Sequence, residues 1–523
     1  MSFPSDLPDN IDALKAMLVA AEAQIRTQDQ VLADRDAVIE RKEDRIIRLE
    51  KLLADFKRAL YGAKSEKGDP DQYHLALEDI ETAMAVVHAE DEAIDPPKTT
   101  GATKSPKGRG VLPKHLPRVE EVIAPDSTTC GCGAERHVIG EDVSERLDIV
   151  PAQFRIIVSR RPKYACRSCE AGIVQVPAKP RLIEGGMPTE ATIASVIVSK
   201  YADHLPLYRQ SQIYARQGVN IDRSTLAFWV GKAAHELKPV HDALLAHLKR
   251  STKLFMDETP APVLDPGRGK TKKGYFWALA RDDRSWNGPE PPGVAFTYTP
   301  GRSGQHAVDI LQAFEGILQV DGYAGYNRVL DPKDNGPIQL AYCWAHARRK
   351  LYELTHHNVA PIAEEGLKQI AALYRIEGQV RGQSAESRLA MRQQKSASKV
   401  ATFKIWLDHA RTQVSAKSPT GQALKYIAKY WGGLILFLND GRIEMDSNAV
   451  ERTIRPIALQ RKNALFAGHD AGAQNWAMLA SLIETCKMNQ IEPHSYLTGV
   501  LTAIVNGHKQ KHIDQLLPWN YAA

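Results

Sequence analysis

The sequence predicts a multidomain α/β protein, and three observations support that prediction. The chain has 523 residues, too many for one hydrophobic core, and at roughly 150 residues per domain it should form three or four folded units. A heptad pattern occupies the N-terminal part, whereas strand-like apolar runs alternate with helical patterns from Leu254 onward. A composition of 43% hydrophobic and 25% charged residues excludes a wholly disordered, collagen-like or disulfide-rich chain.

The sequence has no pattern typical of a membrane protein or an exported protein. The longest apolar run, residues 431–438, is shorter than the roughly 18 residues of a membrane span. Residues 1–10 carry acids and prolines where a signal peptide has a basic start and an apolar run. We therefore expect a cytoplasmic protein without a membrane partner. The net charge of +6 neither demands nor forbids binding to nucleic acid.

Residues 9–67 predict a coiled coil, because aliphatic side chains recur at a strict seven-residue spacing. These a positions are Ile11, Leu18, Ile25, Leu32, Ile39, Ile46, Leu53 and Leu60. The d positions are apolar toward both ends, but Gln28, Arg35 and Lys42 interrupt the middle. We expect self-association through this segment; the alternative is one amphipathic helix packed on its own protein.

The next segment, residues 68–118, separates charge into two blocks. Residues 68–97 hold nine acids and no Lys or Arg, and residues 98–118 hold six bases and no acid. The basic block is rich in Pro, Gly, Ser and Thr, which is typical of a flexible linker. It either lies along DNA phosphates or only keeps the chain in solution.

Residues 119–180 predict a small zinc-ribbon-like module. Its four cysteines are Cys130, Cys132, Cys166 and Cys169. In a reducing compartment four clustered thiols favour one tetrahedral Zn²⁺ over disulfides, although a single residue separates Cys130 from Cys132. The alternatives are four unligated thiols or a mixed site that includes His137. Between the two cysteine pairs, residues 146–161 predict a hairpin.

Residues 188–249 predict a helical region with a helix-turn-helix outline. A helix over 207–217 and a glycine turn at 218–220 precede a second helix, which Asp222 or Ser224 caps and which continues through Lys232. The candidate DNA contacts are Arg209, Arg216, Arg223 and Lys232. The alternative is an ordinary helix pair without a role in DNA binding.

The pattern changes to strands in residues 250–357. Apolar runs predict strands at 253–259, 274–280, 294–298, 317–320 and 340–344, with a helix at 305–314 and another from His346. Three strands, a helix, a strand, then a strand and a helix is the order of a ribonuclease H-like core. The first and fourth strands lie side by side in that fold, so Asp257 and Asp321 should meet at their carboxyl ends.

Two carboxylates at such strand ends repel each other unless a cation lies between them, and Mg²⁺ prefers this ligand type. A third acid is expected on a helix within residues 441–470. There Asp446 or Ser447 caps the helix, Glu451 lies in its second turn, and Pro456 ends it. Glu444 lies outside that helix. Each acid alone could be structural; the order of the three acids and their basic surroundings favour a catalytic magnesium site.

Other features surround these acids. Cys343 and His346 form either a metal half-site or a supporting element that orients the active site. The basic residues beside the catalytic segments are Arg348, Arg349, Lys350, Arg452, Arg455, Arg461 and Lys462, and we expect them to contact DNA.

A helical insertion is expected at residues 358–440. Its basic residues Arg388, Arg392, Lys395 and Lys399 form a solvated face or a DNA contact. Residues 471–523 form a helical cap.

The sequence also resembles a known family over nearly its whole length. The shared motifs include Met-Asp-Glu-Thr at 256–259, Val-Asp-Gly-Tyr at 320–323, Cys-Trp-Ala-His-Ala-Arg-Arg-Lys at 343–350 and Asn-Ala-Val-Glu-Arg at 448–452. Further motifs lie at 60–67, 112–118, 140–145, 200–210, 461–463 and 516–519. In these motifs the sequence resembles the insertion-sequence sixty-six family of bacterial DDE transposases.

The resemblance implies a catalytic triad of Asp257, Asp321 and Glu451 that holds two Mg²⁺ ions. It implies cleavage at the ends of an insertion sequence, transfer of the freed 3′-hydroxyl into target DNA, and accessory proteins from the same element. A bacterial chain of this kind would be associated with the nucleoid when bound to DNA. The cysteine spacing departs from the family pattern, which usually has two residues where this chain has Gly131 alone.

Two alternative functions stay open at this point. One is a DNA-binding regulator derived from a transposase, which the intact Asp257, Asp321 and Glu451 disfavour. The other is a ribonuclease H-fold junction nuclease, which cleaves branched DNA without joining ends. The coiled coil and several binding modules favour an enzyme that pairs two DNA ends.

Overall fold

The computed structural model describes residues 10–61, 118–120, 152–164, 175–265, 270–330, 337–355 and 360–521. The cysteines and His137 of the predicted zinc module, and most of the predicted linker, lie outside these residues. The chain divides into two units, Met1–Val150 and Pro151–Ala523, and each is described by itself. No helix in the described ranges has the length and apolar character needed to cross a bilayer.

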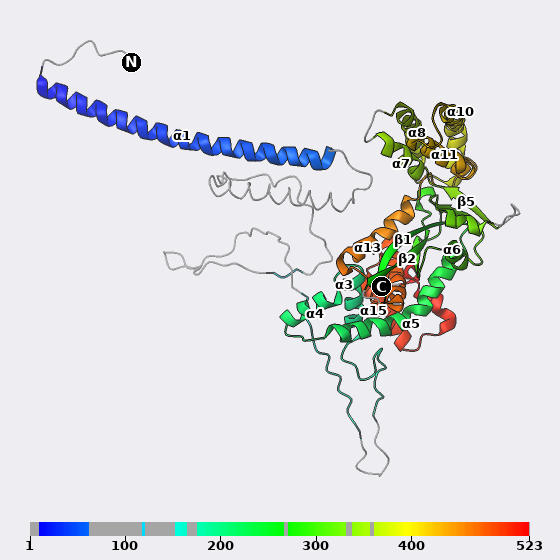
Figure 1. The fold of residues 1–523 in the computed structure, drawn as a ribbon. Helices are drawn as coiled ribbons and strands as arrows, with labels where there is room; N and C mark the ends of the chain where they lie inside the picture. The colour runs from blue at the N-terminus through cyan, green and yellow to red at the C-terminus, as the bar shows by residue number, and fades with distance from the viewer. Residues whose placement is uncertain are drawn as a thin grey trace, which may run out of the picture. The chain divides into compact units, whose positions relative to one another are not determined.

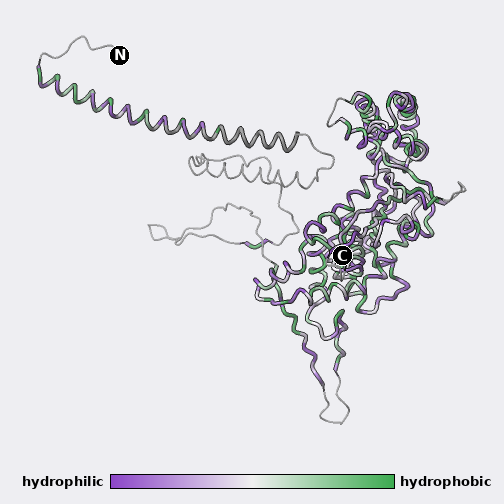
Figure 2. The backbone as a smooth tube through the Cα atoms, viewed as in Figure 1, coloured by the Kyte–Doolittle hydropathy of each residue, from purple (hydrophilic) through white to green (hydrophobic). Residues whose placement is uncertain are grey.

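In the first unit, the described structure is mainly one helix, α1 (Ile11–Tyr61) (Figure 1). Apolar positions recur along it among hydrophilic ones (Figure 2). Its a-position side chains from Ile11 to Ile46 are exposed, between 53% and 68%. The predicted helix is therefore confirmed. An exposed aliphatic row leaves apolar surface for a second helix, and pairing through it stays a prediction.

The second unit begins with the helical region. Its helices are α3 (Glu190–Tyr201), α4 (Leu207–Arg216) and α5 (Arg223–Lys249). Gly218, with φ +79°, lies in the turn between α4 and α5, where a left-handed conformation favours glycine. The two predicted helices are confirmed, but the second continues well past Lys232 because its apolar face stays buried to Leu248. By contrast, the described part of the predicted hairpin, residues 152–161, forms no strand, so that prediction is wrong there.

One mixed sheet of five strands forms the centre of the unit. The strands are β1 (Lys253–Asp265), β2 (Lys270–Arg281), β3 (Gly293–Thr299), β4 (Gly316–Val320) and β5 (Ile338–Tyr342). Their order is β3-β2-β1-β4-β5. β2 is antiparallel to both of its neighbours, β1 and β3, whereas β4 is parallel to both β1 and β5. All five predicted strands are confirmed, as is the pairing of the first with the fourth.

Helices pack against this sheet. A short helix, α6 (Gly304–Ile310), precedes β4, α13 (Asn448–Ala464) packs on β1 and β2, and α14 (Asp470–Met488) packs on β3. Because β3 is an edge strand, it needs partners for its outer backbone groups. Two hydroxyls of α14 supply them: the backbone N–H of Phe296 donates to Ser481 Oγ (2.7 Å) and that of Val294 donates to Thr485 Oγ1 (3.1 Å).

The segment between β5 and α13 folds around its own apolar core. Its helices are α7 (Trp344–Thr355), α8 (Pro361–Val380), α9 (Ala385–Met391), a π-helical turn (Arg392–Ser396), α10 (Ala397–Gln413), α11 (Pro419–Lys429) and α12 (Trp431–Leu434). Trp344, Leu351, Phe403 and Leu424 are fully buried in this core. α7 begins two residues before the predicted start at His346.

The basic face predicted in this insertion is wrong for two of its four residues. Arg388 and Arg392 are buried, at 1% and 0% exposure, and reach neither solvent nor DNA. Arg392 pairs with Glu377 at 2.7 Å and Arg388 pairs with Glu444 at 2.8 Å. Such charges are tolerated in the interior because each has an opposite charge beside it. Lys395 and Lys399 remain exposed.

α13 also differs from the prediction. It runs through Pro456 to Ala464, and Glu451 lies in its first turn rather than its second. A proline inside a helix costs about 3 kcal/mol. Val450 and Ile457 are fully buried beneath α13 against the sheet, and this packing outweighs the local cost. The last α-helix of the described residues is α15 (Pro493–Val505). Short 3₁₀ turns complete the unit: Arg284–Trp286, Ala324–Val329, Leu436–Leu438, Gln510–Leu516 and Pro518–Asn520.

Candidate active site

The sheet register places two of the predicted acids on neighbouring strands, although β1 continues past Asp257 to Asp265 instead of ending there as predicted. Phe255 of β1 is paired with Gln319 of β4, and the next inward-facing positions on the two strands are Asp257 and Asp321. Asp321 follows the last residue of β4, and its Oδ1 accepts the backbone N–H of Tyr323 at 2.7 Å. Strand pairing therefore places Asp257, within β1, next to the carboxyl end of β4, where Asp321 lies.

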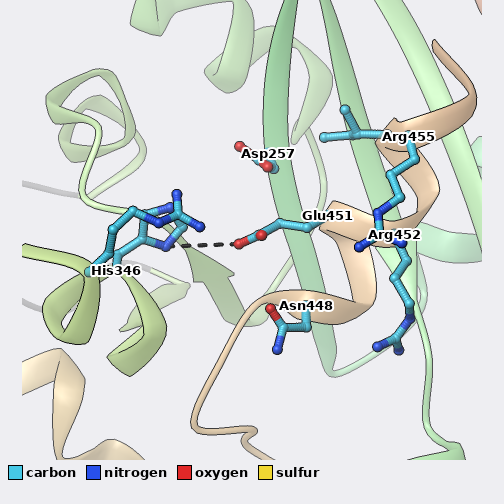
Figure 3. A pocket seen from close by; sticks show the side chains of 8 residues that line it. Asp257, His346, Asn448, Glu451, Arg452 and Arg455 are labelled. Atoms are coloured by element: carbon cyan, nitrogen blue, oxygen red, sulfur yellow. Dashed lines mark ion pairs between the residues drawn. The ribbon is translucent and has the colours of Figure 1, made fainter. Parts of the chain in front are cut away.

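The third predicted acid comes from the helix packed on these strands. Glu451, in the first turn of α13, lies beside Asp257 (Figure 3). Both line a pocket of about 520 Å³. The other lining residues are His346, Arg349, Asn448, Arg452, Ile454 and Arg455. The structure thus brings two of the predicted acids and three of the predicted basic residues into one cavity.

The surroundings of Asp257 in the pocket disfavour the ionised form of its carboxyl group. Burial raises the pKa of this carboxyl well above its ordinary value, and the negative charges of Glu258, Asp321 and Glu451 raise it further. One backbone N–H, that of Glu258, donates to Asp257 Oδ1 at 2.8 Å and offsets part of this effect. A divalent cation among these carboxylates would cancel the repulsion, and their oxygens are the ligands that Mg²⁺ prefers. The donor set therefore fits such an ion.

A half-buried ion pair involves Glu258, the residue after Asp257, and the sequence analysis did not predict it. The Glu258 side chain is 1% exposed and pairs with Arg302, whose Nε donates to Glu258 Oε1 at 2.7 Å. The Tyr326 hydroxyl donates to the other carboxylate oxygen. Arg302 also lies 3.9 Å from the ring centre of Tyr323. The pairing joins residues distant in sequence, and no local pattern indicates it.

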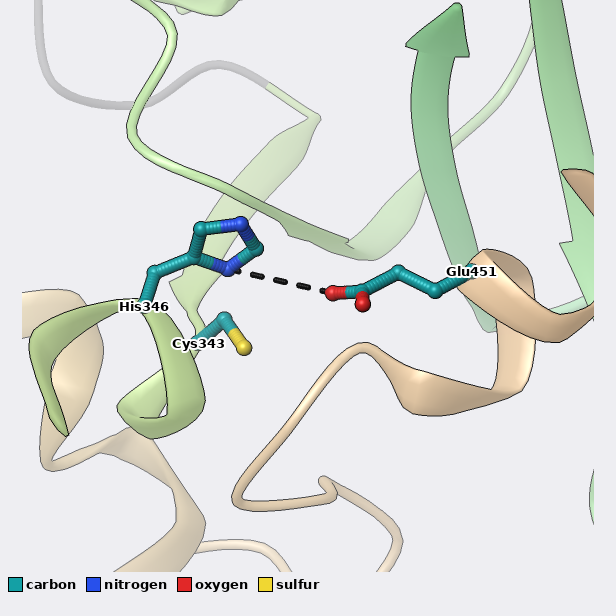
Figure 4. Close-up of side chains that lie close together, drawn as sticks. All are labelled: Cys343, His346 and Glu451. Atoms are coloured by element: carbon teal, nitrogen blue, oxygen red, sulfur yellow. Dashed lines mark ion pairs between the residues drawn. The ribbon is translucent and has the colours of Figure 1, made fainter. Parts of the chain in front are cut away.

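Ser447 and Cys343 connect α13 to the start of α7. The Ser447 hydroxyl donates to Glu451 Oε1 at 3.0 Å, and its backbone N–H donates to Cys343 Sγ at 3.2 Å. His346 Nδ1 lies 3.9 Å from the same Glu451 oxygen. Burial raises the pKa of the Cys343 thiol to about 12. The sequence left Cys343 and His346 as a half-site or a supporting element; the structure adds Glu451 as a third group beside them (Figure 4).

The remaining predicted basic residues fall into three sets. Arg452 and Arg455 are exposed at the pocket on α13; Lys462 is exposed on the same helix, and Lys350 is exposed on α7. Two side chains contact the protein itself: Arg348 lies 5.3 Å from the Tyr352 ring centre, and Arg461 donates to the Pro260 carbonyl. Arg209, Arg216 and Arg223 are exposed on α4 and at the start of α5, outside the pocket lining, and Lys232 is half-buried. DNA contact by these residues stays a prediction.

Comparison with known families identifies the chain. Residues 185–475, which include the sheet and the pocket, match the sequence model described as transposase IS66 family. The chain belongs to the IS66 family of transposases. Residues 481–519 match the IS66 C-terminal element, 127–170 the zinc-finger binding domain of transposase IS66, and 48–120 the domain described as transposase C of IS166 homeodomain. The family resemblance is confirmed; a transposase role follows, with DNA as a partner and a zinc-finger domain at residues 127–170.

This IS66 family member has full-length relatives in Sinorhizobium fredii (strain NBRC 101917 / NGR234). Uncharacterized protein y4qI is 43% identical over 535 residues, which cover 99% of this chain and 98% of the relative. Uncharacterized protein y4jD is 43% identical over 500 residues, covering 93% and 96%. Uncharacterized protein y4hP is 35% identical over 494 residues, covering 91% and 89%.

Proposed function

We propose that this IS66 transposase cleaves DNA at the ends of its insertion sequence and joins the freed 3′-hydroxyl to target DNA. Asp257, Asp321 and Glu451 are its catalytic carboxylates. The observation that carries the proposal is their convergence: Asp257 lies within β1, Asp321 follows the adjacent β4, and Glu451 comes from the helix packed on β1. The raised pKa of Asp257, caused by burial and by the other acids, supports a cation-dependent site.

We further propose that the sheet is a ribonuclease H-like core. Its order, β3-β2-β1-β4-β5 with only β2 antiparallel to its neighbours, agrees with the topology that the sequence predicts. The helices of residues 344–434 are an insertion between the second and third acids. That arrangement separates the acids in sequence without separating them in space.

Mg²⁺ is the cation that these residues would hold, through the carboxylates of Asp257, Asp321 and Glu451. When bound, two such ions supply an activated nucleophile and stabilise the leaving oxygen of the phosphodiester. Bound cations would also neutralise the three acids and so let a DNA phosphate approach, because the unneutralised carboxylates repel anions.

The chain's own residues supply positioning and charge. Ser447 holds one oxygen of Glu451, and the ion pair between Glu258 and Arg302 holds the part of β1 next to Asp257. Arg452 and Arg455 project from the face of α13 that borders the pocket (Figure 3). Guanidinium groups there attract the phosphates that flank the scissile bond.

DNA ends would be recognised by other parts of the chain. We assign α4 and the start of α5, with Arg209, Arg216 and Arg223, and the zinc-finger domain to this role. Pairing of two ends would use self-association through α1, whose exposed aliphatic row suits a second copy. Accessory proteins of the same element complete the proposed assembly.

The proposal is tested with DNA that carries the element's own ends, with and without Mg²⁺. Asp257→Asn, Asp321→Asn and Glu451→Gln should each abolish Mg²⁺-dependent nicking at the ends while retaining end binding in a mobility-shift assay. Asp408→Asn removes an exposed carboxylate on α10 and serves as the matched control, because it should retain both activities.

Three results would contradict the assignment. Full cleavage by any of the three variants would remove that acid from the site. A wild-type protein that binds ends but never nicks them would be a DNA-binding regulator. A wild-type protein that cuts branched DNA and never joins ends would be a junction nuclease.

A further inference from the structure

Three side chains of different ligand type meet at one edge of the pocket. The ligand atoms of Cys343, His346 and Glu451 all lie within 4.8 Å of one another (Figure 4). Cys343 and His346 come from the junction of β5 and α7, and Glu451 comes from the first turn of α13. We refer to these residues as the Cys–His–Glu cluster. It contains one thiol, one imidazole and one carboxylate.

The fold holds the backbone of this cluster in place. The backbone N–H of Trp344, next to Cys343, donates to the Met445 carbonyl at 2.8 Å. The Trp344 indole is fully buried and donates to the Leu434 carbonyl at 2.7 Å, which fixes the start of α7. Preorganised ligands lose little conformational entropy when an ion binds.

One polar atom of the cluster lacks a partner. His346 Nδ1 is buried and makes no hydrogen bond among the described residues. Its 3.9 Å separation from Glu451 Oε1 is too long for a hydrogen bond. Buried polar atoms in folded proteins are almost always satisfied, and an unsatisfied one often marks a missing water or ion. The atom points toward Glu451, beside the Cys343 sulfur (Figure 4).

We propose that the Cys–His–Glu cluster binds a zinc-class divalent cation through Cys343 Sγ, His346 Nδ1 and Glu451, with release of the thiol proton to solvent. Thiolate and imidazole suit Zn²⁺, whereas Mg²⁺ prefers oxygen ligands only. Ligand atoms around a tetrahedral Zn²⁺ lie roughly 3.4–3.7 Å apart, as follows from bond lengths of about 2.0–2.3 Å. The His346–Glu451 separation is already close to that spacing. A tetrahedral ion with these three protein ligands keeps its fourth position for water.

The site is compatible with the proposed catalytic role of Glu451. Both Ser447 Oγ and His346 Nδ1 face Oε1 of this glutamate, so Oε2 remains for a hard cation beside Asp257. A zinc-class ion would tie α13 to α7 and fix the orientation of the Glu451 carboxylate. The binding itself does not depend on the transposition chemistry and is measured without DNA, so its failure is distinct from failure of the proposed function.

The test measures bound zinc on the full chain. Protein stripped with a chelator is dialysed against buffered, low-micromolar free Zn²⁺ in excess Mg²⁺, and zinc per chain is determined by plasma mass spectrometry. Wild type should hold one more equivalent than Cys343→Ser or His346→Gln. Cys486→Ser is the matched control, because Cys486 is the other buried free cysteine of the described residues and should leave the zinc content unchanged. Cys166→Ser, in the zinc-finger domain, should lose only zinc from that domain.

Cobalt substitution gives a second readout. The difference spectrum of wild type minus Cys343→Ser should contain a sulfur-to-cobalt charge-transfer band, since the zinc-finger cysteines contribute equally to both proteins. If Cys343→Ser does not fold, His346→Gln carries the test, because its side chain is partly exposed and its loss leaves the core intact. Equal zinc content in wild type and a folded His346→Gln or Cys343→Ser variant would overturn the proposal.

Discussion

Removing Arg302 should destabilise the metal-free protein more than removing Arg302 and the Glu258 charge together. Arg302 makes two contacts with Glu258, whose side chain is 1% exposed. The Arg302→Ala variant leaves a buried carboxylate beside Asp257 and Asp321 with only Tyr326 as a partner. A second change, Glu258→Gln, deletes that uncompensated charge and keeps an oxygen for the Tyr326 hydroxyl. The second substitution should therefore restore stability.

The magnitude follows from the exposure of the two partners. Breaking a fully buried ion pair by deleting one partner costs about 3–5 kcal/mol. Arg302 is 42% exposed, so water replaces part of the lost interaction. We therefore expect about 1–3 kcal/mol for Arg302→Ala. The added Glu258→Gln change should recover about 1–2 kcal/mol of that loss. The lost cation–π contact with Tyr323 is common to both variants and cancels in the comparison.

The assay is urea unfolding at neutral pH without divalent ions, followed by tryptophan fluorescence. All 8 tryptophans lie between Trp229 and Trp519, so the signal reports only on the unit that contains the sheet. The single variants, the double variant and wild type complete a double-mutant cycle. A double variant no more stable than Arg302→Ala would show that Glu258 is not a buried charge held by Arg302.

Three further predictions concern the same unit. Burial raises the pKa of Asp257, so the folded metal-free protein binds a proton at this carboxyl more tightly than the unfolded chain does. The free energy of unfolding should therefore fall as pH rises from the ordinary aspartate range toward the raised pKa. Asp257→Asn should make this fall smaller, as measured by the urea midpoint. Ser447→Ala removes the hydroxyl that holds Glu451, the proposed catalytic glutamate, and should slow the proposed Mg²⁺-dependent end cleavage about fivefold, the equivalent of about 1 kcal/mol, in a gel assay; an unchanged rate would contradict this role. Thr485→Val leaves the Val294 N–H and C=O buried without a partner and should cost about 1–3 kcal/mol by urea unfolding. Thr502→Val, an exposed threonine on α15, should cost far less.

The strands and the position of the acids could be predicted because their signals are local. An apolar run of strand length that ends in an acid, as in residues 253–259 and 317–321, needs no distant partner to be recognised. The order of strands and helices then limits the pairings, and the observed pairing of β1 with β4 follows from it. Asp257 and Asp321 could therefore be predicted as candidate site residues from the sequence alone.

The features that the sequence analysis missed depend on contacts between distant segments. Pro456 signals a helix end locally, yet the buried face of α13 keeps the helix going. Arg388 and Arg392 have the spacing of a solvated helix face, but they pair with Glu444, which follows the insertion, and with Glu377, which lies within it. Helical periodicity identifies which residues share a face; it does not identify what that face packs against.

Two parts of β1 set the spacing between Asp257 and Glu451, two of the proposed catalytic acids. Asp257 lies near the middle of β1, and further along that strand the backbone pairs with the segment after α13: the Leu264 N–H donates to the Ala467 carbonyl (2.8 Å), and the Ala467 N–H donates to the Pro262 carbonyl (3.0 Å). Because α13 also packs on β1, the helix that carries Glu451 is held against the strand that carries Asp257. Burial and the neighbouring negative charges raise the pKa of Asp257, and backbone hydrogen bonds and buried packing keep these acids together. A cation entering this site finds its ligands already in position, so the binding energy is not reduced by the entropy of ordering them.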